Sequence, residues 1–371
     1  MEYECDIAVV GMGIVGLAHA YFAAKAGEKV ILMDGDQRPV GASARNFGFV
    51  TISGQASGEM WRFARRTREV WAELVDKAGI RVHQNGVHII AQRPEAARVL
   101  EAFHNSYMGE ETQIISSKNF LNNFEAPFKK NICSVLFSPH EMRINPIEAL
   151  SQLLQYLEQE MGVKVLRQFP VQSVDSGLCE SIKGKVKSSF VYLCTGDSNS
   201  HFFKNQIDFT RCKLQMLKIG SNGFKFPSTI MTDLSLARYT GFRSLPEADD
   251  LEKRLKLECQ NQLDHGIHLI VAQNMDGSLV IGDSHEYSHR PDPFQSEMID
   301  RLILRELKDL VDIGEINVLD RWIGTYAHSK QKDWGTEEVA HNVFHSVITS
   351  GAGMSTSLAI AEKNIQKALN L

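Results

Sequence analysis

The hydrophobic pattern of the first 34 residues predicts a strand, a helix and a second strand. An apolar run, C-D-I-A-V-V, ends in a glycine-rich turn, and a helical pattern then extends to Gly27. A second apolar run, K-V-I-L-M, follows and ends at Asp34. This order predicts one βαβ unit over residues 4–34.

The turn in this unit carries three glycines in the spacing of a dinucleotide site. Gly11 allows a tight turn out of the strand, Gly13 lets the backbone approach a pyrophosphate, and Gly16 lets the helix pack on the strand. Asp34 is placed to accept hydrogen bonds from the adenosine ribose, and its charge would repel the 2′-phosphate of NADP. A glycine triplet alone also occurs in ordinary turns, but the flanking strands and the terminal acid favour bound FAD or NAD.

Later apolar runs predict a second sheet that is antiparallel. Several of these runs have no crossover helix between them, which argues against parallel pairing. A helix is predicted over 146–161, with Asn145 as its cap and Pro146 at its first position. After it, strands at 163–167 and 189–197 are expected to return to the first sheet. The strand-like runs of the second sheet are 86–92, 133–138, 213–219, 267–273 and 278–283.

Composition and charge narrow the classes of function. A chain of 371 residues with 43% hydrophobic and 23% charged residues is typical of an enzyme of two domains. The net charge of −5 indicates no nucleic-acid partner, and no apolar run is long enough to cross a membrane, so we expect a cytoplasmic protein. The six cysteines form no C-x-x-C pair, and neither a disulfide nor a metal site is predicted.

Three further segments carry the small residues that line ligand sites. Residues 35–57 are rich in Gly and Ser, where an NAD-dependent dehydrogenase would normally continue with strands and helices. Two apolar strands end in Thr195-Gly196 and in the segment 350–357, where backbone N–H groups would face a ligand. Neither segment is followed by a strand that ends in an acid, so a second site for NADPH is not expected. If the dinucleotide is FAD, its electrons therefore come from a substrate that is oxidised.

These motifs together resemble the FAD-dependent amine and amino-acid oxidoreductases of the D-amino acid oxidase, glycine oxidase and sarcosine oxidase superfamily. The resemblance covers the whole chain and rests on G-M-G-I-V-G with Asp34, G-A-S-A-R-N-F-G, C-T-G-D and S-G-A-G-M-S-T-S. A narrower branch, associated with phosphonate catabolism, is similar to this chain in R-N-F-G-F-V-T-I-S-G-Q, R-C-K-L-Q-M, D-G-S-L-V-I-G-D-S-H-E-Y and R-W-I-G-T-Y.

The pattern and the resemblance together predict an α/β fold, α+β overall. A Rossmann-like FAD-binding domain with a parallel sheet would be interleaved with a substrate-binding domain built on an antiparallel sheet with helices. The FAD-binding domain would comprise residues 1–80, 140–212 and 327–371, and the substrate-binding domain residues 81–139 and 213–326.

The resemblance also assigns the cofactor to particular residues. The ADP half would lie on the glycine turn and Asp34, and the positive end of the last helix would stabilise negative charge on the reduced flavin. No cysteine beyond Cys259 lies in the C-terminal third, so FAD is expected to be bound non-covalently. The implied set is Gly11, Gly13, Gly16, Asp34, Ser43, Arg45, Asn46, Val171, Thr195, Gly196, Gly351, Gly353 and Met354.

The implied reaction moves a hydride from the carbon next to an amine to the flavin N5 atom. The resulting imine would be hydrolysed, and oxygen or another acceptor would reoxidise the flavin. The expected substrate is a small amine with an acidic group, such as 2-aminoethylphosphonate or its N-methyl form. A catalytic base is not required, and His268 and His285 are candidates for that role. The candidates for binding the substrate are the cations Arg143, Lys213, Arg321 and Lys330 and the aromatic residues Tyr326 and Trp322.

Three other interpretations stay open at this point. The chain could be an oxidase or dehydrogenase of glycine, sarcosine or a D-amino acid. It could be an NAD-dependent dehydrogenase, which would be colourless, or a flavin-binding sensor without catalytic activity. The sequence also leaves open the electron acceptor, the chirality of the substrate and whether the chain forms a homo-oligomer.

Overall fold

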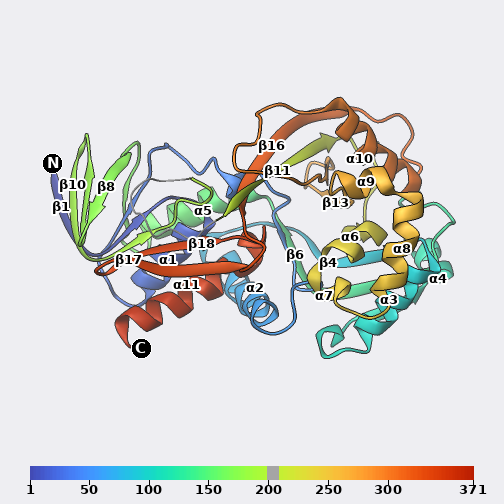
Figure 1. Cartoon of the computed structure of the whole chain (residues 1–371), viewed down its shortest axis with the longest axis horizontal. Helices are drawn as coiled ribbons and strands as arrows, with labels where there is room; N and C mark the ends of the chain where they lie inside the picture. The colour runs from blue at the N-terminus through green and yellow to red at the C-terminus, as the bar shows by residue number, and fades with distance from the viewer. Residues whose placement is uncertain (199–208) are drawn as a thin grey trace.

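The computed structural model describes residues 1–198 and 209–371, which form two lobes, each built on its own sheet (Figure 1). The two sheets contain eight and ten strands. One is mostly parallel and the other mostly antiparallel, as predicted. The mixed α/β fold expected from the sequence is therefore confirmed.

The first sheet contains the predicted βαβ unit. The helix α1 (Ile14–Lys25) connects β1 (Glu2–Val10) to β2 (Val30–Met33), and the two strands pair in parallel. Both strands predicted to return to this sheet do so, because β7 (Lys164–Leu166) pairs in parallel with β2 and β10 (Gly184–Leu193) with β1. The remaining strands are β8 (Val171–Asp175), β9 (Leu178–Ser181), β17 (Trp334–Ala340) and β18 (Val343–Ile348).

Four helices cover one face of the first sheet. Helix α1 packs there with α2 (Glu59–Ala78), α5 (Pro146–Gln159) and α11 (Gly353–Leu369), and their apolar side chains share one core with the strands. Helix α5 begins as predicted, since the side-chain oxygen of Asn145 accepts hydrogen bonds from two backbone N–H groups of the first turn.

The second sheet is antiparallel with one exception. Strand β12 (Thr229–Thr232) pairs in parallel with β4 (Val82–Ala91), which differs from the wholly antiparallel sheet that the sequence predicts. About 140 residues separate these two strands, so their direction was not set by a short connection. The other strands are β3 (Phe49–Val50), β5 (Gln113–Ser116), β6 (Ser134–Ile144), β11 (Thr210–Ile219), β13 (Ile270–Gln273), β14 (Leu279–Gly282), β15 (Glu286–Ser288) and β16 (Val318–His328).

The helices of the second lobe lie around this sheet (Figure 1). Residues 248–264 form two helices, α8 and α9, and Leu251 and Leu255 of α8 are buried in the core. The helices are α3 (Pro94–His104), α4 (Ser117–Asn123), α6 (Asp233–Arg238), α7 (Thr240–Arg243), α8 (Ala248–Glu258), α9 (Gln260–Asp264) and α10 (Glu297–Leu310), and short 3-10 turns span Ala42–Ala44 and Tyr107–Gly109.

The division into two domains stays a prediction. Strand β3 of the segment 1–80 pairs with β6 at Met142 and Arg143, so the second sheet includes residues from two of the segments assigned to the FAD-binding domain. Residues 199–208 of the segment 140–212 lie outside the described residues.

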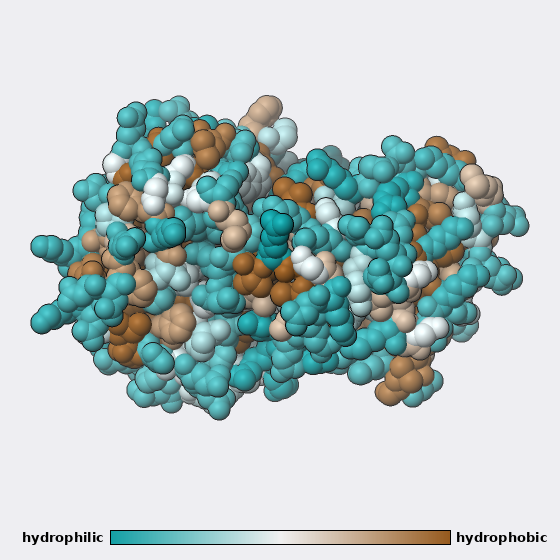
Figure 2. All heavy atoms as spheres, turned by 180° about the vertical axis from the view of Figure 1, so that it is seen from behind, coloured by the Kyte–Doolittle hydropathy of each residue, from teal (hydrophilic) through white to brown (hydrophobic). Residues whose placement is uncertain are grey.

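One face of the molecule is mainly polar. Figure 2 shows hydrophilic side chains over most of one face, with apolar side chains in small patches. Within the described ranges, no helix is both long enough and apolar enough to cross a membrane.

Two buried histidines should make the free energy of unfolding depend on pH. Burial lowers the pKa of His19 and of His88 to about 4, so both are neutral in the folded chain. Between pH 6.5 and 4 the unfolded chain binds more protons, and stability is lost as pH falls through this window. From pH 7 to pH 5 each histidine should reduce the free energy of unfolding by about 2 kcal/mol.

Urea unfolding at the two pH values measures this effect. The ring of His88 lies among those of Phe120, Phe124 and Phe137, so His88→Phe should fit this site. The variant should lose about 2 kcal/mol less than the original chain on going to pH 5. An identical loss in both proteins would contradict the assignment.

Candidate active site

A cavity of about 410 Å³ lies where the two lobes meet. The Gly/Ser-rich segment 35–57 and the start of α11 line it from the first lobe. From the second lobe it is lined by strands β13, β15 and β16, by the helices α6 and α7, and by Asp283 and His285, which follow β14. The cavity thus joins the predicted cofactor segments to the predicted substrate-binding sheet.

The glycines of the first turn sit where the backbone requires them. Gly11 has φ +110°, and a Cβ atom there would lie 2.3 Å from the carbonyl oxygen of Cys194. A Cβ atom on Gly16 would lie 1.8 Å from the carbonyl oxygen of Gly11. Gly13 precedes α1, and the hydroxyl of Ser43 accepts a hydrogen bond from the backbone N–H of Ile14 at 2.9 Å.

Asp34 and the loop after it form a connected network. The Asp34 carboxylate accepts hydrogen bonds from the backbone N–H of Met12 at 2.6 Å and of Asp36 at 2.8 Å, and burial raises its pKa. The side chain of Asn46 donates to two carbonyl groups of its own loop and accepts from the backbone of Gly48. Asn46 therefore holds Ser43 and Arg45 at the cavity wall.

The other predicted cofactor residues take three different positions. Gly196, Gly351, Gly353 and Met354 line the cavity, and Gly351 has φ +74° with Tyr326 packed against it. The hydroxyl of Thr195 is buried and has no hydrogen-bond partner among the described residues. Val171 begins β8 and is absent from the described cavity wall.

On the opposite wall, a carboxylate lies between two imidazoles. The Nε2 atom of His268 is 3.0 Å from Oδ1 of Asp283, and Nε2 of His285 is 3.7 Å from Oδ2. All three residues are buried and line the cavity. One imidazole nitrogen or carboxylate oxygen from each lies within 4.8 Å of those of the other two. Burial and the nearby Arg238 lower the pKa of His285 to about 3. The sequence indicated the two histidines but not Asp283 between them.

A cation that the sequence analysis missed also lies on this wall. Arg238, the last residue of α6, lines the cavity and donates a hydrogen bond to the Tyr287 hydroxyl at 2.9 Å. Tyr326 and His328 line the same region, and the rings of His328 and Tyr287 are 4.3 Å apart. Arg238 is therefore the cation best placed to meet an anionic ligand near these rings.

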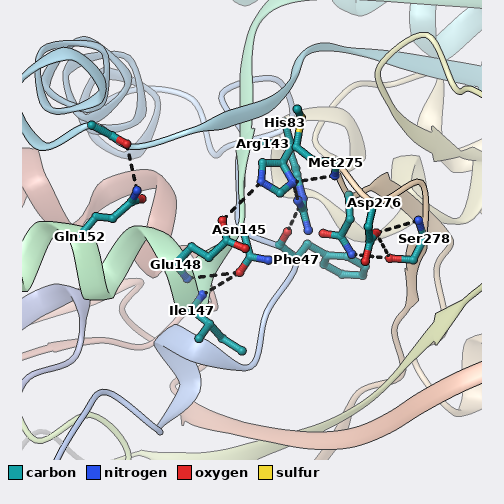
Figure 3. Close-up of polar contacts among 12 residues, drawn as sticks. Phe47, His83, Arg143, Asn145, Ile147, Glu148, Gln152, Met275, Asp276 and Ser278 are labelled. Carbon is teal, nitrogen blue, oxygen red and sulfur yellow. Dashed lines mark hydrogen bonds and ion pairs between the residues drawn. The ribbon is translucent and has the colours of Figure 1, made fainter.

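Of the residues predicted to bind the substrate, Tyr326 reaches the cavity and the cations do not. Arg143 is buried beneath the wall, where it donates to the carbonyl oxygen of Phe47 at 3.1 Å and lies 2.6 Å from His83 (Figure 3). Lys213 pairs with two acidic side chains, and Arg321 pairs with Asp300 at 2.7 Å. Lys330 is exposed, and Trp322 donates to the carbonyl oxygen of Arg45.

Comparison with known proteins identifies the family. Residues 6–364 match the family described as FAD dependent oxidoreductase. The chain belongs to this family. FAD is therefore its cofactor, and the alternative of an NAD-dependent dehydrogenase is not supported.

Individual relatives agree with this assignment. Monomeric sarcosine oxidase of Bacillus sp. (strain NS-129) is 28% identical over 218 residues, which are 54% of this chain and 54% of that enzyme. The match thus spans about half the length of that curated relative. Glycine oxidase from Bacillus cereus ATCC 14579 has the same fold, with a TM-score of 0.79, 16% identity and coverage of 99% of this chain and 95% of that one. L-proline dehydrogenase from P. horikoshii has a TM-score of 0.81 at 17% identity, with coverage of 100% and 94%.

The glycine turn and the residues around it are suited to hold FAD. Side chains are absent at Gly11 and Gly16, where a Cβ atom would collide with backbone, so the turn stays narrow beside Gly13. The buried hydroxyl of Thr195 needs a polar partner that a bound dinucleotide would supply. We expect the glycine turn, Asp34 and the loop at Ser43 to hold FAD, with the start of α11 beside its ring; these individual assignments stay predictions.

Proposed function

We propose that this FAD-dependent oxidoreductase oxidises a small amine that carries an acidic group. The observation that carries the proposal is the cavity wall on which Arg238 and Asp283 present opposite charges toward the same space. An amine with an acidic group carries both charges at neutral pH. The similarity to sarcosine and glycine oxidases supports an amine as the reacting group.

The protein side chains position and shield the substrate. FAD, when bound, accepts a hydride from the carbon next to the amine, and water hydrolyses the resulting imine. The Arg238 guanidinium donates a hydrogen bond to the Tyr287 hydroxyl and binds the acidic group of the substrate. The amine is thereby held at a set distance from the guanidinium. The N–H groups and the positive end of α11 stabilise negative charge that develops beside them.

We further propose that the acidic group is a phosphonate, as in 2-aminoethylphosphonate or its N-methyl form. A phosphonate has three oxygens and needs more donors than a carboxylate. Arg238, Tyr287 and His328 together offer donors from three elements at one end of the cavity. The four segments that resemble the phosphonate-linked branch also support this choice.

The second candidate is an oxidase or dehydrogenase of glycine, sarcosine or a D-amino acid. The names of the relatives favour it, and Arg238 alone would suffice for a carboxylate through a bidentate pair. The two candidates share the cofactor and the reaction and differ in the group at the Arg238 end. A cytoplasmic location, and oxygen or another compound as electron acceptor, belong to both proposals.

A substrate panel separates these candidates. The purified holoenzyme is assayed with 2-aminoethylphosphonate, its N-methyl form, glycine, sarcosine and D-alanine, with product aldehyde or keto acid measured in each case. We expect kcat/KM to be highest for one of the two phosphonates. Turnover of the carboxylates alone would assign the second candidate, and no turnover with any amine would contradict both.

A further inference from the structure

The hydrogen bonds of His285 determine where its ring carries a proton. Its Nδ1 atom lies 2.9 Å from the carbonyl oxygen of Gly266, and a carbonyl oxygen can only accept. Nδ1 therefore carries the hydrogen, and the neutral ring has a lone pair on Nε2. This Nε2 atom lies 3.7 Å from Oδ2 of Asp283, which is also an acceptor.

His268 holds the carboxylate from its other side. Its Nδ1 atom lies 3.1 Å from the Ser235 hydroxyl, which can donate to it. Nε2 of His268 then carries the hydrogen and donates to Oδ1 of Asp283 at 3.0 Å.

Two acceptors, Oδ2 of Asp283 and Nε2 of His285, therefore lie side by side at the cavity without a donor between them. His268, Asp283 and His285 are 3%, 5% and 8% exposed, so water cannot freely supply the missing hydrogen bonds. Two buried acceptors that face each other without a donor are costly, and a cation with several N–H groups would satisfy both at once. The arrangement thus has the chemistry of a receptor for a small cation.

We propose that His268, Asp283 and His285 form the site that binds the ammonium group of the substrate. A primary alkylammonium has three N–H donors and its N-methyl form has two, so either can donate to both acceptors. The inference rests on the proposed function and adds to it, because Arg238 on the same wall would bind the acidic end. The site would then select zwitterions over simple acids and simple amines.

Paired ligands test the ammonium site without turnover. In 2-amino-2-methylpropylphosphonate the carbon that bears the amine has no hydrogen, so it cannot be oxidised, and 2,2-dimethylpropylphosphonate replaces the amine with methyl. The corresponding carboxylate pair is 2-aminoisobutyrate and pivalate. Binding to holoenzyme is measured by calorimetry and by the change in flavin absorbance. Asp283→Asn should weaken binding of the amine in a pair by about tenfold or more and leave the amine-free partner unchanged.

Asp276→Asn is the matched control. Asp276 is at the turn between β13 and β14, seven residues before Asp283, and its side chain is 61% exposed. This variant should bind both ligands as the original chain does. Flavin content and melting temperature of each variant show whether the fold is retained.

Each contrary result has a distinct meaning. Equal binding of the amine by Asp283→Asn and by the original chain, or an equal loss for both ligands of a pair, would overturn the ammonium site. One bound divalent metal per chain that Asp283→Asn loses would also overturn it and assign the cluster to a metal. If the original chain oxidises no amine in the substrate panel, the proposed function fails, whatever the ligand pairs show.

Discussion

Replacing Arg238 by alanine should reduce kcat/KM for the preferred substrate by about a hundredfold or more, equivalent to about 3 kcal/mol. The guanidinium is the cation that lines the cavity beside Tyr287, and its hydrogen bond to the hydroxyl holds it in place. Removal would leave the acidic group of the substrate without its charged partner. Arg238→Lys should recover little, since an ammonium cannot make the bidentate contact. The measurement is the rate of flavin reduction against substrate concentration under anaerobic conditions.

Arg321→Ala is the control for this result. Arg321 pairs with Asp300, and its half-exposed side chain is outside the cavity wall. We expect this variant to be less stable but to keep its affinity for the substrate. If Arg321→Ala lost the affinity and Arg238→Ala kept it, the acidic group would bind away from Arg238. Arg321, which the sequence analysis proposes as a substrate ligand, would then be preferred.

Replacing Gly16 by alanine should give a protein that binds flavin at least tenfold more weakly. The added Cβ atom would lie 1.8 Å from the carbonyl oxygen of Gly11, so either helix α1 or the turn must move. Overpacking of this kind costs about 1–3 kcal/mol, and 1.4 kcal/mol corresponds to a factor of ten in affinity. Flavin absorbance per chain after purification, and titration of the apoprotein with FAD, measure the change.

Gly220→Ala provides the comparison. A Cβ atom at Gly220 would meet nothing within 4 Å, and this residue follows β11 in the other lobe. Its flavin content should equal that of the original chain. Full flavin occupancy in Gly16→Ala would contradict the view that the glycine turn must keep its shape to hold FAD.

The cofactor half of the site was predictable because its signals are local. Gly16 is required by the carbonyl oxygen of Gly11, five residues away, and Asp34 follows the next strand of the same βαβ unit. The spacing of apolar residues and the turn residues therefore predicted the parallel sheet, the capped helix α5 and the last helix. The structure adds the contacts among them, such as the hydrogen bond from Met12 to Asp34.

The substrate half was not predictable in the same way. Arg238 ends a helix of six residues, and only tertiary packing brings it to Tyr287 from β15. Arg143 was proposed as a ligand, yet its strand pairs on both sides, and its side chain turns into the protein toward Phe47. A cation in a sequence shows its charge but not the direction of its side chain. The parallel pairing of β12 with β4 had no local signal for the same reason.

The central claim is that this cavity couples an acidic amine to FAD, and an anaerobic titration tests it most directly. Holoenzyme is mixed with each amine of the panel in the absence of oxygen while the flavin spectrum is recorded. We predict that one phosphonate amine bleaches the oxidised flavin band in full and that the amine-free phosphonate leaves it intact. A flavin spectrum that no acidic amine can bleach would contradict the account and favour a flavin-binding protein without this activity.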